Sequence, residues 1–186
     1  MRRRLRVLVV LGIVVVLVAG AAVVVFTTKP DLDDKQERVD ARWRPLRKPL
    51  QLRYQVLAGV EQAVTAAGGG ERAVIKDLRD AFDRWAKLAG QPDDEADPRA
   101  EAETANELEA LAARLRADVN GSERLKTVQP ILAAIAMFDS TVVPPPAVRA
   151  YNRAVHDYQD TREGTLASVV VAIFGYDDRP TLVVGG

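Results

Sequence analysis

The pattern of hydrophobic and polar positions divides the chain into an uncharged start and a longer amphipathic body. The twenty residues from Val7 to Phe26 contain no charged residue and no proline. A helix of this length spans about 30 Å, the thickness of the hydrocarbon core of a bilayer. The pattern therefore predicts a transmembrane helix over residues 7–26, which would place the lipid bilayer among the partners of the chain.

The body carries apolar residues at steps of three and four, the spacing of one face of an α-helix. In residues 32–67 this stripe consists of Val39, Trp43, Leu46, Leu50, Tyr54, Leu57, Val60 and Val64. Similar stripes follow in residues 71–89, 97–138 and 146–174. Because each stripe has to be buried against another, the sequence predicts an all-α fold, with an antiparallel bundle of about four helices over residues 27–175.

Glycines, prolines and capping residues mark the expected helix ends. Pro45 and Pro49 lie inside the first stripe and predict a kink or a helix start near residue 50, because proline lacks the backbone donor and clashes with the preceding turn. The three glycines at 68–70 are expected to end that helix. Asp97 followed by Pro98 predicts the start of the third helix.

The later part of the body gives weaker signals. The third helix is expected to continue through Phe138, with a bend at Pro130, and Gly164 is expected to weaken the last helix by about 1 kcal/mol relative to alanine. Residues 169–171 are β-branched, which is also typical of strands, but the body offers no clear partner strand, and a helix is favoured. Residues 176–186 are turn-rich and predict a loose C-terminal tail.

Charge is balanced overall but not along the chain. Lys and Arg total 26 and Asp and Glu total 26, while residues 1–26 hold four arginines and no acid, so residues 27–186 carry a net charge of −4. Basic residues gathered at 1–6 predict a cytoplasmic N-terminus and an extracytoplasmic body. A mildly acidic body argues against nucleic acid as a partner, because binding to phosphates needs basic clusters.

A cleaved signal peptide is the alternative to an uncleaved anchor. Ala19, Gly20 and Ala21 have the small side chains of a cleavage site, and cleavage there would make the protein a secreted soluble bundle. However, apolar sequence resumes at once with residues 22–26, and twenty residues is long for the core of a signal peptide. The uncleaved anchor is therefore the favoured interpretation.

Candidate chemistry is sparse. The chain has no cysteine and one histidine, which argues against thiol catalysis and most zinc sites. Asp31, Asp33 and Asp34 resemble the start of a calcium loop, but Gln36 and Arg42 stand where the sixth-position glycine and the twelfth-position glutamate are needed. His156 has no neighbour that would make a catalytic triad. We expect no catalytic, cofactor-binding or metal-binding residues.

One stretch of the last helical segment resembles the LemA family. Residues 148–158 read VRAYNRAVHDY, which is similar to the family segment R-x-Y-N-x-x-V-x-x-Y-N, with Gln159 in place of the final asparagine. Residues 50–54, LQLRY, resemble the first-helix pattern of the family. The residues that carry the resemblance are Arg53, Tyr54, Tyr151, Asn152, Val155 and Tyr158.

The resemblance implies a membrane-anchored helical protein without an established catalytic activity. It supplies no substrate, and the six motif residues are expected to be structural, because a buried asparagine or tyrosine needs polar partners and so fixes how elements pack. The sequence as a whole predicts a single-pass, non-catalytic scaffold or interaction module with an unidentified protein partner. The alternative is a module that binds a small ligand between its helices, which requires a cavity with converging polar groups.

Overall fold

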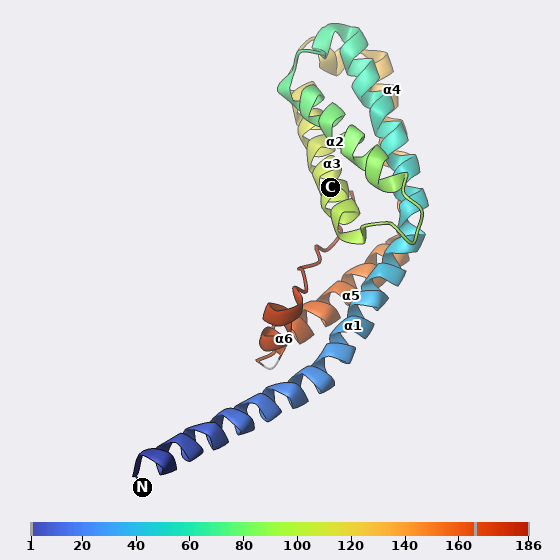
Figure 1. Cartoon of the computed structure of the whole chain (residues 1–186). Coiled ribbons are helices and arrows are strands. Elements are labelled where there is room, and N and C mark those ends of the chain that lie inside the picture. The colour runs from blue at the N-terminus through green and yellow to red at the C-terminus, as the bar shows by residue number, and fades with distance from the viewer. Residues whose placement is uncertain (1, 166, 186) are drawn as a thin grey trace.

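The computed structural model describes residues 2–165 and 167–185, with side chains from residue 25 onward except at 166. The described part of the chain is all-helical (Figure 1). Its α-helices are α1 (Arg2–Val64), α2 (Ala73–Ala89), α3 (Pro98–Asn120), α4 (Gln129–Ser140), α5 (Pro145–Arg162) and α6 (Ala167–Phe174). A π-helical turn, Thr65–Gly69, follows α1, and a 3-10 turn, Leu125–Thr127, precedes α4.

The long helix α1 is the spine of the molecule. It runs for 63 residues, and α2, α3, α4, α5 and α6 all contact it. The apolar stripe predicted in residues 32–67 is confirmed, because each of its eight residues is at most 2% exposed. The first part of α1 projects away from the other helices, while α2 and α3 form a hairpin beside its far end (Figure 1).

Of the kink or helix start expected near residue 50, the helix start is wrong. Pro30, Pro45 and Pro49 all lie inside α1, which continues through them and curves along its length (Figure 1). Each proline removes one helical hydrogen bond, at a cost of about 3 kcal/mol in a helix interior. Trp43, Leu46 and Leu50 are completely buried beside these prolines, so packing of the stripe outweighs the local penalty.

The helix count differs from the predicted four because two expected helices each break in two. The chain leaves α3 at Gly121 and makes the 3-10 turn before α4 begins with Pro130 in its first turn, where a missing N–H costs nothing. The last segment ends at Arg162 and resumes as α6, with Gly164 in the gap. Residues 169–171 are helical in α6, as predicted.

Residues 175–185 have no regular secondary structure but are not a loose tail. This segment, called the C-terminal strap from here on, leaves α6 and runs back to α3 (Figure 1). Tyr176, Arg179 and Leu182 are 9%, 7% and 1% exposed, respectively. The turn-rich composition correctly indicates the absence of a helix, but it does not reveal the hydrogen bonds that hold the segment in place.

The capacity of a helix to cross a bilayer depends on its side chains, which the structure describes from residue 25 onward. Within that part, no single helix combines the length and the apolar character needed to cross a bilayer, although α4 and α5 together, bent by 62°, satisfy the same criterion. The predicted span at 7–26 and the basic segment at 1–6 lie almost wholly outside the residues whose side chains are described. The transmembrane helix therefore stays a prediction.

Two glycines near the end of α1 should respond oppositely to substitution by alanine. Gly59 lies inside α1 with open space around its Cβ position, whereas Gly68 has φ +78° and an added Cβ would lie 2.9 Å from the Arg124 guanidinium. Gly59→Ala should raise the free energy of unfolding by about 0.5–1 kcal/mol. Gly68→Ala should lower it by about 1–2 kcal/mol. Urea denaturation measures both, and equal effects of the same sign would contradict the assigned end of α1.

Candidate functional site

Two asparagines hold the C-terminal strap from opposite sides. Asn152 on α5 donates to the carbonyl of Leu182 at 2.9 Å and accepts from its amide at 2.8 Å. Asn106 on α3 donates to the carbonyl of Thr181 at 2.7 Å and accepts from the amide of Val183 at 2.9 Å. Each side chain thus bonds the strap backbone twice, which fixes the strap to both α3 and α5.

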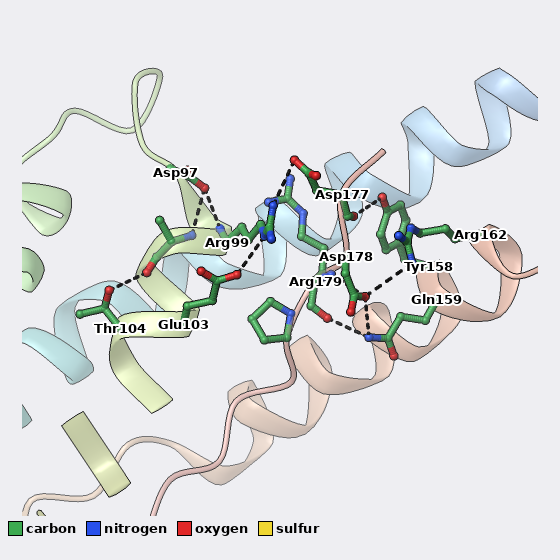
Figure 2. A network of polar contacts seen from close by, with 12 residues as sticks. Asp97, Arg99, Glu103, Thr104, Tyr158, Gln159, Arg162, Asp177, Asp178 and Arg179 are labelled. Atoms are coloured by element: carbon green, nitrogen blue, oxygen red, sulfur yellow. Dashed lines mark hydrogen bonds and ion pairs between the residues drawn. The ribbon is translucent and has the colours of Figure 1, made fainter. Parts of the chain in front are cut away.

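The other polar residues on this face of α5 also bind the strap backbone. The bonds join Tyr151 Oη to the Pro180 carbonyl at 2.8 Å, Tyr158 Oη to the Asp177 carbonyl at 2.8 Å and Gln159 Nε2 to the Arg179 carbonyl at 2.9 Å. Figure 2 shows the last two of these bonds. Burial raises the pKa of both tyrosines, so they remain neutral donors. Tyr151 and Tyr158 are seven residues apart, and so are Asn152 and Gln159. A separation of seven residues is about two helical turns, so these residues lie on one face of α5.

The remaining motif residues do not bind the strap. Val155 is completely buried in the core. Arg53 on α1 binds both carboxylate oxygens of Glu109, at 2.6 and 2.9 Å, and its guanidinium lies 4.0 Å from the centre of the Phe138 ring. Tyr54 Oη donates to the carbonyl of Ala105 at 3.1 Å. The structure therefore brings Tyr151, Asn152 and Tyr158 together on the strap, while Arg53 and Tyr54 join α1 to α3.

A buried acid also joins α1 to α3, and its burial was not predicted from the sequence. Glu101 on α3 is 0% exposed and accepts from Trp43 Nε1 at 2.6 Å and from Arg47 Nε at 3.1 Å. Burial raises the pKa of this carboxyl, and the hydrogen bond from Trp43 and the charge of Arg47 oppose the rise. Glu103 and Glu107 are exposed on the outer side of α3, whereas Glu101 is buried and the Glu109 side chain is only 10% exposed.

The signal for Glu101 was present in the spacing. Glu101 stands four residues before Ala105 and seven before Leu108, so it continues the buried stripe of α3. An acid in the register of an apolar stripe needs a cationic or hydrogen-bonding partner. Arg47, four residues after Trp43 on α1, is such a partner. The sequence pattern therefore indicates an ion pair between α1 and α3.

A polar cleft lies between the strap, the start of α3 and residues 29–36 of α1. Its volume is about 470 Å³, and its lining is largely charged. Arg99 pairs with Asp177 of the strap at 3.1 Å and with Glu103 at 2.9 Å, as Figure 2 shows. Asp97 caps α3 by accepting from the amides of Arg99 and Ala100, which confirms the predicted helix start.

Acids in and beneath this cleft face cationic partners. Asp33 accepts hydrogen bonds from Lys29 and from the hydroxyl of Tyr176, and these bonds lower the pKa of its carboxyl. Asp40 lies 3.3 Å from the Arg179 guanidinium, and burial raises the pKa of Asp40 against the effect of that charge. These charge pairs and hydrogen bonds hold the strap against α1 and α3.

Metal-binding side chains are not clustered among the described residues. No cluster there of three or more His, Asp or Glu side chains could hold a metal ion. His156 is exposed on α5. A groove of about 330 Å³ between α1 and α2 presents the rings of Tyr54, Phe82 and Trp85 together with the amides of Gln51 and Gln55. The small-ligand alternative needs converging polar groups, which are few in this groove and more numerous in the polar cleft described above, and it stays a prediction.

Comparison with protein-family models, with curated proteins and with solved structures finds no match to this chain. The resemblance to the LemA family therefore stays a prediction that rests on the residues quoted above.

Asn152→Ala should release the C-terminal strap. The change removes two hydrogen bonds and leaves the amide and carbonyl of Leu182 without their partner, which should cost about 1–3 kcal/mol of stability. Hydrogen exchange should show faster exchange at residues 180–185. His156→Ala, an exposed site on the same helix, is the matched control. Unchanged exchange in the strap would contradict the structural role of Asn152.

Glu101 should make stability depend on pH in a defined direction. Because its pKa is raised in the folded state, folded protein binds the proton more tightly, and stability falls as pH rises from about 4.3 through the raised pKa. Glu101→Gln removes this titration, so the variant should gain stability relative to the wild type as pH rises through this window. Denaturation at several pH values measures the difference, and Glu103→Gln on the exposed side of α3 is the control. A loss of stability of Glu101→Gln relative to the wild type as pH rises through this window would contradict the assignment.

Proposed function

We propose that the protein is a single-pass, membrane-anchored helical bundle that acts as a non-catalytic scaffold or interaction module at the outer face of a membrane. The observation that carries the proposal is the continuity of α1. The uncharged segment 7–26 and the spine of the bundle belong to one helix, Arg2–Val64. An anchor that continues directly into the spine would hold the body at a fixed position above the bilayer.

The sequence around the uncharged segment supports the orientation. Arginines occupy positions 2, 3, 4 and 6 before it, and Asp31, Asp33 and Asp34 follow it. Basic residues are retained on the cytoplasmic side of single spans. The body would then lie outside the cytoplasm, with its helices joined to α1.

The packing of the body supports a scaffold over an enzyme. The buried Glu101 and the partly buried Asp40 lie against the guanidinium groups of Arg47 and Arg179, respectively. The polar groups of the motif residues Tyr151 and Asn152 form hydrogen bonds with the strap backbone. These interactions favour a firmly held framework, on which a partner would bind from outside. An unidentified protein partner is part of this proposal.

The proposal predicts an uncleaved, membrane-embedded chain whose body is accessible from outside. The test combines the intact mass of the mature protein, flotation with membranes and digestion by external protease. Full-length mass, flotation and digestion of the body are expected. A chain shortened near residue 21 and removed by washing would overturn the anchor and leave a secreted soluble bundle.

A variant pair makes the anchor test specific. Val15→Arg together with Val16→Arg places two charges at the centre of the segment, and each should cost about 2.5–3.5 kcal/mol of insertion. Flotation should be lost for this variant. Val15→Leu with Val16→Leu keeps the segment apolar and should float like the wild type.

A further inference from the structure

The short helix α6 exposes an apolar face. Ala167 and Val170 are buried at 3% and 0% exposure, but Val169, Ile173 and Phe174 on the other side are 43%, 60% and 46% exposed. The helix sequence ASVVVAIF contains no charged residue. Apolar surface of this kind in a charge-free element marks a contact with something outside the described chain.

The position of α6 identifies where that contact lies. Phe174 lies beneath the ammonium of Lys29, which is 5.4 Å from the ring centre. Lys29 is three residues beyond Phe26, the last residue of the uncharged segment, and Phe26 is itself 80% exposed. Three residues of helix correspond to about 4.5 Å. The exposed face of α6 therefore lies within about one helical turn of the end of the predicted span.

Figure 1 shows the same relation for the backbone. α6 lies beside α1 at the base of its projecting part, and the contact between the two helices is one of those that hold α6 in place. The face of α6 thus sits on the side of the body from which the projecting helix leaves. If residues 7–26 cross a bilayer, this side faces the bilayer surface.

We infer that α6 lies in the headgroup region of the outer leaflet and seats the body on the membrane. The inference rests on the proposed function, because the bilayer occupies this face only if residues 7–26 are embedded. A short helix lying in the interface buries its apolar face at the boundary of headgroups and acyl chains. Phe26, Ile173 and Phe174 supply this apolar surface, and Lys29, whose ammonium pairs with Asp33, lies at its edge.

The surrounding charges indicate which lipid property matters. Asp33 pairs with Lys29 and Asp31 pairs with Lys35, and the two acid side chains are 48% and 54% exposed, respectively. These acids oppose attraction to anionic headgroups, so burial of apolar surface has to supply the contact. We therefore expect α6 to enter vesicles of phosphatidylcholine, without a requirement for anionic lipid and with little dependence on salt.

The chain contains no cysteine, so single-cysteine variants report on one position each. Ile173→Cys reports on α6, and Met137→Cys on α4 is the matched control with nearly the same exposure, 61% against 60%. Met137 adjoins Phe138, whose carbonyl accepts from Arg53. Position 53 is 27 residues beyond Phe26 on α1, a distance of about 40 Å along the helix. Phe26→Cys reports on the anchor itself.

The experiment labels each full-length variant with an environment-sensitive fluorophore in phosphatidylcholine vesicles that carry a headgroup-level quencher. Labels at 26 and 173 should shift to the blue and lose most of their fluorescence, while the label at 137 should remain water-like and unquenched. Quenching at 26 with none at 173 would overturn the inference and leave the proposed function standing. A chain that does not float, with no quenching at 26, would overturn both. Circular dichroism confirms that each variant is folded.

Discussion

Everything in the body depends on one uninterrupted apolar stripe along α1. The stripe continues through Pro45 and Pro49, and α2 to α6 all pack against the helix that carries it. A helix of this length with interior prolines would be poorly stable alone, so the packing of the other helices and the continuity of α1 support each other. The same continuity connects the segment proposed as an anchor to the centre of the bundle.

Polar interactions then determine how the elements sit on this spine. Glu101 with Trp43 and Arg47, and Glu109 with Arg53, join α3 to α1 at two places along both helices. Glu109 also accepts from the amide of Gly185 at 3.3 Å, so the end of the strap bonds to the same junction. Removal of either partner would leave a buried charge unpaired, which strongly disfavours alternative registers. The strap completes the arrangement by bonding α3 and α5 together.

The helical periodicity was sufficient to predict the all-α fold, the buried stripe of α1 and the Asp97 cap of α3. It was insufficient where local penalties compete with tertiary packing, as at Pro45 and Pro49, because the packing partners lie far away in sequence. The motif around Tyr151 and Asn152 drew attention to the correct face of α5. Its partner, the backbone of residues 177–182, was missed because a turn-rich segment carries no pattern that reveals hydrogen bonds to its main chain. Glu101 was missed for a different reason, since its register with the apolar stripe was visible but its charge suggested the surface.

The central claim is that one rigid helix joins the anchor to the bundle, and a distance measurement in the membrane tests it most directly. Phe26 and Leu52 are both exposed on α1, at 80% and 56%, and are 26 residues apart. Spin labels on cysteines at these two positions should give one narrow distribution in the full-length protein in vesicles, centred a little below about 39 Å, the length of a straight helix of 26 residues, because α1 curves. A broad distribution, or one centred well below this distance, would show a hinge between anchor and bundle and would contradict the account.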